Sequence, residues 1–274
     1  KSPQQDGTGP DVGAVDAAGG SVVRGRVTAR KPPMPLPGEV RALWIKKKTL
    51  GTPEEIVKAV EDAKSAGFNT LIAQVRARGD AMYGSELAPR AAMLDSQDPA
   101  FDPLALLIKE AHARGLSVHA WLNTFFVAGC DDLPSNPAHV CNVRPDWLMA
   151  PREHAEELWN LDPSEPAYKS RLVTHARARK HVVEGLYLSP ANPEVRQHLH
   201  DVWLEVATRY DVDGLHFDVM DGQFVPPITF GDQMVASLRP LGPTPFEAHL
   251  MTLTPERHFE AFARAGCQRI IFHA

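Results

Sequence analysis

The sequence predicts an α/β protein of the TIM-type (β/α) barrel class, and the alternation of its segments is the main reason. Short apolar segments of strand length alternate with longer segments whose apolar residues recur at helical spacing. Short connections between such segments are typical of parallel strands joined by right-handed crossovers. The strand segments are too apolar to be solvated on one face, as expected for a barrel or a doubly wound sheet. About six strands are recognisable where eight close a barrel, so closure stays open at this point.

The composition argues against two classes of protein and sets the first 38 residues apart. The 274 residues include 29 Lys and Arg against 34 Asp and Glu, a net charge of −5, which argues against nucleic-acid binding. No apolar run reaches the roughly 18 residues that a membrane-spanning helix needs. Residues 1–38 are rich in Gly, Pro and small residues and have no sustained periodicity. We therefore expect a disordered leader or linker there.

The first strand–helix–strand unit follows this leader. A short apolar strand is predicted at 41–45. The residues TPEE at 52–55 predict a helix start, because the Thr caps the helix, the Pro suits the first helical position and the second Glu completes a capping box. Gly67 is expected to end this helix. The next strand is predicted at 69–75.

The middle of the chain continues the pattern and then interrupts it. A helix is predicted at 102–115, where Asp-Pro opens it and Gly ends it, and a strand follows at 116–122. A long segment at about 124–165 has no regular period, so we interpret it as an irregular insertion. A helix is expected at 166–180.

The alternation resumes in the last third of the chain. Asn-Pro and Thr-Pro pairs predict two of its helix starts, and short apolar runs predict its strands. The predicted elements are helices at 192–210, 232–239 and 254–266, and strands at 213–218, 246–251 and 269–274.

The three cysteines do not form a metal-binding motif. Cys130 and Cys141 bracket a loop, and either a disulfide in an exported protein or two unpaired thiols would suit this spacing. Cys267 follows Gly266 and is expected to be a small buried residue.

The most specific chemical motif is His216-x-Asp218. Two residues that are two apart on a strand point to the same face, so this imidazole and this carboxylate belong together at a strand end. Active sites of barrels lie at the carboxyl ends of strands. The next strand contributes His249, with Glu247 on the same face. Two histidines and a carboxylate from neighbouring strands can hold a divalent metal, whereas a lone HxD motif is more often polar filling of a core or surface.

The last part of the chain resembles ribulose-phosphate 3-epimerase. The resemblance rests on LHFDVMDGQFVPPITFG, FEAHLM and PERHFEAFARAGCQRIIFHA and covers about residues 212–274. It implies that His216, Asp218 and His249 bind one catalytic divalent metal ion (Zn, Fe or Mn). It also implies that Asp218 is one of two acid/base groups that move the C3 proton of a pentulose 5-phosphate through an enediolate.

Other features of this resemblance are weaker. It implies that Met220 and Met251 line the substrate pocket, although both also suit a plain core. Pro227 stands where the family usually has Asn. The second catalytic aspartate and the phosphate-binding loop of the family come from later strands than those recognised here, so an inactive protein is an open alternative.

The longer part of the chain resembles the glycosyl-hydrolase-like family 10 domain. The resemblance covers about residues 39–218 and rests on VRALWIKKKTLGTPEEIVKAVEDAKSAGFNTLIAQVRARGDAMY, FDPLALLIKEAHARGLSVHAWLN, GLYLSPANPEVRQHL and YDVDGLHFD. It implies an exported bacterial barrel that acts on polysaccharide or cell-wall glycan. The two resemblances meet at Gly214–Asp218, so we divide the chain into a leader at 1–38 and barrel portions at 39–211 and 212–274.

The glycan interpretation needs a carboxylate partner for Asp218. Glycosidic chemistry places two carboxylates roughly 5–10 Å apart. Asp80 and Glu86, in the loop after the second strand, are candidates, although loop carboxylates are usually only solvated. The weaker glycan-binding candidates at or after strand ends are Arg76, Asp80, Trp121 and Asn123.

Three functions follow as hypotheses. The sequence favours a metal-dependent sugar-phosphate 3-epimerase, because its motif is the more specific one. The alternatives are an exported glycoside-hydrolase-like protein that binds or cleaves glycans, and a non-catalytic hybrid or fragment. The first predicts a cytoplasmic protein with a small sugar phosphate as substrate, and the second an exported or periplasmic one. The oligomeric state is left open.

Overall fold

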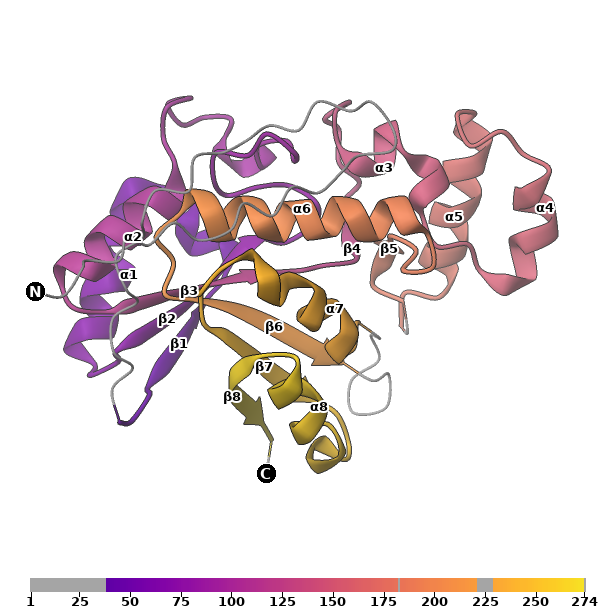
Figure 1. Ribbon diagram of the computed structural model, residues 1–274. Coiled ribbons are helices and arrows are strands. Elements are labelled where there is room, and N and C mark those ends of the chain that lie inside the picture. Colours follow the sequence, from indigo (N-terminus) through magenta and orange to yellow (C-terminus); the bar gives the residue numbers. More distant parts are fainter. Residues whose placement is uncertain (1–37, 182, 221–228, 274) are drawn as a thin grey trace, which may run out of the picture. The chain divides into compact units, whose positions relative to one another are not determined.

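The computed structural model describes residues 38–181, 183–220 and 229–273, and its main feature is a curled parallel sheet (Figure 1). The predicted leader at 1–38 therefore lies almost wholly outside the described residues. The strands of the sheet are β1 (Ala42–Ile45), β2 (Thr70–Arg76), β3 (Ser117–Leu122), β6 (Gly214–Met220), β7 (Phe246–Met251) and β8 (Cys267–Phe272). They pair in the order β1-β2-β3-β6-β7-β8, all in parallel. The predicted α/β class with an incomplete TIM-type barrel is thereby confirmed.

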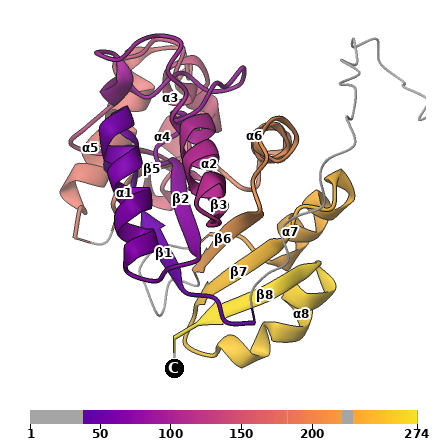
Figure 2. The same cartoon turned by 90° about the vertical axis from the view of Figure 1, so that its left-hand side faces the viewer.

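Helices cover the outer face of this sheet (Figure 2). They are α1 (Pro53–Ser65), α2 (Pro103–Ala113), α6 (Pro193–Arg209), α7 (Asp232–Leu238) and α8 (Phe259–Arg264). The predicted starts of three of them are confirmed, because the side chains of Thr52, Asp102 and Asn192 accept hydrogen bonds from backbone N–H groups of the first turn. Apolar residues of the helices and of the outward strand positions form one core, in which Trp203 of α6 stacks on Phe217 of β6 at 4.4 Å between ring centroids.

The inner face of the sheet differs from the predicted pattern. The strands were expected to be apolar on both faces, but alternate residues along them are polar or aromatic and point away from the helix-covered core. These inward positions hold Trp44 on β1, Gln74 and Arg76 on β2, His119 and Trp121 on β3, His216 and Asp218 on β6, and Glu247 and His249 on β7. Most of these side chains are buried, so the sheet encloses a polar interior rather than a solvated face.

The sheet remains open at two edges. Within the described part of the chain, β1 pairs only with β2, and β8 pairs only with β7. Phe272 at the end of β8 is half-exposed. The edges expose unpaired backbone groups, which in a complete barrel would be hydrogen-bonded to further strands.

The segment predicted as irregular contains regular structure, so that prediction was wrong. It holds β4 (Phe126–Gly129), α3 (Val140–Val143) and α4 (Ala155–Trp159), and α5 (Pro166–Ala178) and β5 (Gly185–Tyr187) follow it. The antiparallel pair β4–β5 and these helices enclose a second core, which includes Val127, Trp147 and Leu172. Both strands are too short to show a period, which explains why sequence reasoning missed them. The helix expected at 166–180 is confirmed as α5.

Smaller expectations were corrected or resolved. The helix predicted from Thr254 begins instead at Phe259, after a short 3₁₀ turn. Cys130 and Cys141 are both buried and free, so the structure supports the unpaired-thiol alternative, and Cys267 is only half-buried. Among the described helices, none combines the length and the apolar character that crossing a membrane requires.

Candidate functional site

The predicted residues of β6 and β7 converge on the inner face of the sheet. The two strands pair so that His216 lies opposite Glu247 and Asp218 lies opposite His249. The Asp218 Oδ1 atom lies 3.2 Å from His216 Nε2 and 3.1 Å from His249 Nδ1. Ligand atoms of these three side chains all lie within 4.8 Å of one another. The strand register therefore places one carboxylate between two imidazoles.

Glu247 of β7 orients His216, one member of this cluster, and contacts two further side chains. Its Oε1 atom accepts a hydrogen bond from His216 Nδ1 at 2.7 Å and lies 2.9 Å from His119 Nδ1. Its Oε2 atom accepts a hydrogen bond from Arg269 at 2.7 Å. Glu247 is only 2% exposed, so this carboxylate joins side chains of four strands in a buried ionic network.

Gly214 makes room for this network. It lies opposite His119 in the register of β3 and β6. A Cβ atom at Gly214 would lie 2.9 Å from three atoms of the His119 ring, a separation that real Cβ atoms do not adopt. The glycine of the Asp-Gly-Leu-His segment thus lets an imidazole pack directly against the backbone of β6.

Two tryptophans flank the cluster. The ring of Trp44, on β1, lies 5.7 Å from that of His216 and 5.5 Å from that of His249. Trp121, on β3, lies 6.4 Å from His216. Trp44 is 40% exposed, and its ring contacts the two histidines that flank the Asp218 carboxylate. Because the sheet curls, β1 faces β6 and β7 across its interior (Figure 2).

The ionic contacts shift the pKa values of the cluster. Burial opposes the charged form of His216, but hydrogen bonds to Asp218 and Glu247 outweigh it and raise the pKa of this histidine to about 8. Burial alone would raise the pKa values of Asp218 and Glu247, yet their hydrogen bonds to histidines hold both pKa values below the usual range. Both carboxylates are therefore ionised at neutral pH.

The remaining candidates do not join this contact network. Arg76 is 1% exposed and donates to the backbone carbonyls of Asn123 and Thr124, while its Nε and Nη2 atoms have no hydrogen-bond partner. Asn123 itself donates to the Ala77 carbonyl at 2.8 Å. Met220 and Met251 lie opposite each other just beyond Asp218 and His249, both half-buried.

The two loop carboxylates have other surroundings. Asp80 lines a cavity of about 230 Å³ together with Lys47, Arg78 and His139. The Glu86 side chain is 83% exposed and pairs with Arg209 at 3.2 Å. Neither residue is placed by the structure as the partner carboxylate that Asp218 would need for glycosidic chemistry.

Sequence reasoning missed several members of the site. Trp44, His119 and Arg269 come from other strands, and the sequence gives no spacing that connects them to His216. His273 also joins, because its Nε2 atom lies 3.0 Å from His249 Nε2. Glu247 had been noted only as a neighbour of His249. The residues Asp221, Gly222 and Pro227 of the epimerase-like motif lie outside the described residues.

The donor set fits a divalent metal. His216, Asp218 and His249 offer two imidazole nitrogens and one carboxylate oxygen, which suit Zn²⁺ and similar ions. The hydrogen bond from His216 Nδ1 to Glu247 leaves Nε2 facing Asp218, and this is the usual second contact of a metal-binding histidine.

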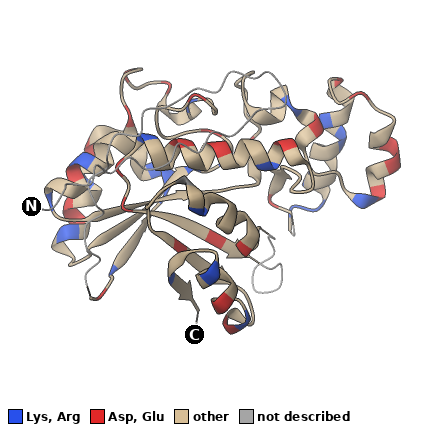
Figure 3. Cartoon of the chain, in the orientation of Figure 1, with Lys and Arg blue, Asp and Glu red and all other residues tan. Residues whose placement is uncertain are grey.

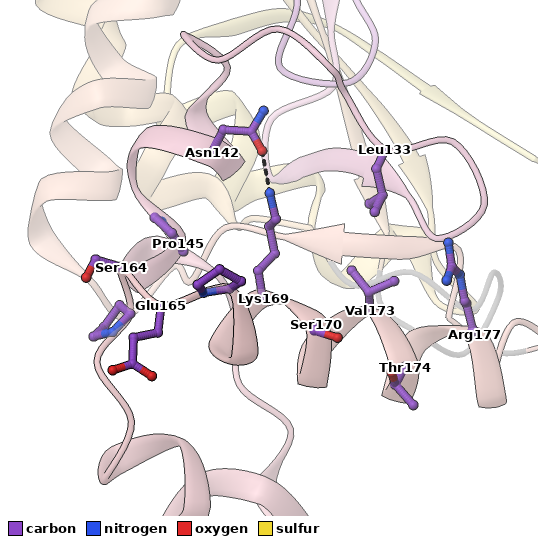
Figure 4. A pocket seen from close by; sticks show the side chains of 12 residues that line it. Leu133, Asn142, Pro145, Ser164, Glu165, Lys169, Ser170, Val173, Thr174 and Arg177 are labelled. Carbon is purple, nitrogen blue, oxygen red and sulfur yellow. Dashed lines mark hydrogen bonds between the residues drawn. The ribbon is translucent and has the colours of Figure 1, made fainter.

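A further cavity lies in the insertion, away from the sheet (Figure 4). It has a volume of about 380 Å³ and lies beside α5, lined by Lys169, Val173 and Arg177 among others. Lys169 donates to Asn142 Oδ1 at 2.6 Å, so this ammonium is already partnered.

The fold and the site define an α/β-barrel protein whose candidate site occupies the carboxyl ends of parallel strands. The family model described as glycosyl hydrolase-like 10 matches residues 39–238, and the chain belongs to that family. It is 30% identical over 197 residues to glycosyl hydrolase YngK of Bacillus subtilis (strain 168), which covers 66% of this chain and 32% of YngK. The chain spans about a third of the length of the curated family members that it matches.

The epimerase resemblance is also present, but it is partial. The chain is 47% identical over 62 residues to ribulose-phosphate 3-epimerase of Bacillus subtilis (strain 168), over 23% of this chain and 29% of the epimerase.

Among solved structures, pullulanase from Paenibacillus barengoltzii superposes with a TM-score of 0.52 at 14% identity, covering 89% of this chain and 41% of that one. At this identity the similarity shows the fold alone.

Proposed function

We propose that this chain is a carbohydrate-active protein that binds a glycan on the inner face of the sheet, at Trp44, Trp121 and Asp218. This is the alternative that the sequence ranked second. The family match over 39–238 supports it over the epimerase, whose match spans only 62 residues. The observation that carries the proposal is the partly exposed Trp44, whose ring contacts both histidines that flank the ionised Asp218 carboxylate.

The chemistry of these groups suits a sugar ring. An exposed indole face packs against the apolar face of a pyranose, and a nearby carboxylate accepts hydrogen bonds from its hydroxyl groups. Asp218, whose lowered pKa keeps it ionised, suits the role of nucleophile or hydrogen-bond acceptor. A general acid needs a raised pKa, and the ionic network holds the pKa of Glu247 low, so Glu247 does not fill that role.

Replacing Trp44 by alanine is expected to weaken glycan binding roughly 10- to 100-fold, because burying an indole face contributes about 1.5–3 kcal/mol. Calorimetric titration with soluble chito-, cello- and malto-oligosaccharides measures this. Trp159→Ala is the matched control, since Trp159 is 89% exposed on α4 and belongs to another part of the fold. Equal affinities of the two variants for every oligosaccharide would refute the proposed site.

Cleavage is tested separately. Reducing ends released from cell-wall polysaccharides report hydrolysis, and Asp218→Asn should abolish any release while retaining the fold. Release that survives this substitution would exclude Asp218 from the chemistry.

A second candidate function is metal-dependent proton transfer on a sugar phosphate. The convergence of His216, Asp218 and His249 favours it, together with the epimerase resemblance. A divalent ion held there would supply Lewis-acid stabilisation of a sugar carbonyl. The chain's own contribution would be Asp218, whose ionised carboxylate can accept a proton, and Glu247, which orients His216.

Metal content separates the two candidates. Protein dialysed against Zn²⁺ or Mn²⁺ and then desalted is expected to retain one additional equivalent of ion compared with the His249→Ala variant, as measured by mass spectrometry. His258→Ala is a suitable control, because His258 follows a 3₁₀ turn outside the cluster. If wild type and His249→Ala retain the same amount of metal, the metal-dependent candidate is wrong.

A further inference from the structure

A second group of metal-ligating side chains lies in the insertion, on the surface formed by α4, α5 and the 3₁₀ turn Arg152–His154. Glu153 and His154 come from this turn, and His175 comes from α5. The His175 Nδ1 atom lies 2.9 Å from Glu153 Oε1, and the His154 Nε2 atom lies 3.9 Å from the same oxygen. One ligand atom of each residue lies within 4.8 Å of the others. We propose that Glu153, His154 and His175 form a binding site for a divalent transition-metal ion of the Zn²⁺ class.

The donor set supports this assignment. Two imidazoles and one carboxylate are ligands of Zn²⁺, which binds nitrogen at about 2.0–2.1 Å and carboxylate oxygen at about 2.0–2.2 Å. Ligand atoms around such an ion lie roughly 3.3 Å apart, a value between the two distances found here. The two imidazole rings are perpendicular, with centroids 5.2 Å apart, so they lie edge to face and are not stacked.

Ion pairs with neighbouring arginines hold the acidic side chains around the group in place. Arg179 donates to both oxygens of Glu153 at 2.9 Å, and Arg171 pairs with Glu157. Residues 171, 175 and 179 lie four apart on α5 and at its C-cap, so they share one face, and they pair with Glu157 and Glu153. Basic residues on α5 and acidic residues on α4 are coloured in Figure 3. Arg179 is 49% exposed on its side chain and can turn to solvent when a cation replaces it.

The position of the group gives the site a structural role. An ion held by these residues would cross-link α5 to the turn that precedes α4, and α4 and α5 both contribute residues to the second core. Metal that binds only the folded arrangement stabilises it in proportion to its occupancy. This site is independent of the glycan site and of the cluster around Asp218.

The test uses the full chain with His249→Ala, so that the sheet cluster loses one of its three ligands. Titration calorimetry with Zn²⁺ is expected to show one site, whose affinity falls at least 10-fold in His175→Ala and in Glu153→Gln. His181→Ala is the matched control, because His181 is exposed and follows the same helix. Co²⁺ absorption provides a second readout, since tetrahedral coordination gives intense visible bands that should disappear with His175→Ala.

Arg179→Ala distinguishes a metal site from a plain ion-pair cluster. Removing the competing guanidinium frees Glu153, so Zn²⁺ affinity should rise several-fold. If Arg179→Ala weakens Zn²⁺ binding, or if His175→Ala and His181→Ala bind Zn²⁺ equally, the group is a surface ion-pair cluster only and the proposal is overturned. Circular dichroism of each variant verifies that α5 is retained.

Discussion

Glu247→Gln is expected to lower the free energy of unfolding by about 3 kcal/mol, one of the two largest effects that the structure predicts. The substitution keeps the shape of the side chain but leaves His119, His216 and Arg269 without their shared anion. Removing one partner of a buried ion pair typically costs about 3–5 kcal/mol, and the partial exposure of Arg269 places the expected value near the lower end. Urea denaturation of wild type and variant measures the difference.

The control for this experiment is Glu256→Gln, because Glu256 is exposed on the 3₁₀ turn before α8. It should change stability by less than about 0.5 kcal/mol. A Glu247→Gln protein as stable as this control would show that the buried network does not stabilise the sheet.

The same network predicts a dependence of stability on pH. The folded protein raises the pKa of His216 from 6.5 to about 8, so its contribution is complete below about pH 6.5 and is lost as the pH rises through 8. In Glu247→Gln one of the two carboxylates that raise this pKa is absent, so the loss of stability between pH 6.5 and 8 should be smaller than in wild type.

Gly214→Ala is the second substitution with a large expected effect. The new Cβ atom would lie 2.9 Å from three atoms of the His119 ring, and neither the buried ring nor the strand backbone has room to move freely. Overpacking of this kind costs about 1–3 kcal/mol, and the displaced imidazole would also leave Glu247. The melting temperature and the glycan affinity of the variant should both decrease.

Gly38→Ala is the matched control, because a Cβ atom at Gly38 meets nothing within 4 Å. An unchanged melting temperature in Gly214→Ala, equal to that of Gly38→Ala, would mean that His119 does not pack against β6 as described.

Much of the fold could be predicted because its signals are local. Capping residues such as Thr52 and Asp102 predicted helix starts. The alternation of apolar strand segments with helical segments predicted parallel strands. The convergence of His216, Asp218 and His249 followed from the period of two along a strand and from the adjacency of consecutive strands. The β4–β5 pair could not be predicted, because strands of four and three residues are too short to show a period. Their pairing also needs a glycine at 185, since a Cβ atom there would lie 1.9 Å from the Ala128 carbonyl oxygen, and this contact is distant in sequence.

The part of the site that sequence reasoning missed depends on the curl of the sheet. Trp44 is far from His216 in sequence and three pairings away in the sheet, and only the curvature brings the two rings to 5.7 Å. The ranking of functions changed because the family match spans residues 39–238, whereas the epimerase match spans only 62 residues. The motif around Asp218 suits both chemistries, so it could not decide between them.

The position of β6 in the sheet has a consequence for how such barrels diversify. This strand pairs with β3 through His119, Ala120 and Trp121 and with β7 from Leu215 to Met220, and both resemblances meet at its Gly-Leu-His-Phe-Asp segment. The hydrogen bonds that join β6 to β3 and to β7 come from the backbone and do not depend on side-chain identity. Strand–helix units of different ancestry can therefore be joined at β6 with these backbone hydrogen bonds retained. Compatibility then depends on the inward contacts across this pairing, among them the imidazole of His119 against Gly214 and beside Glu247.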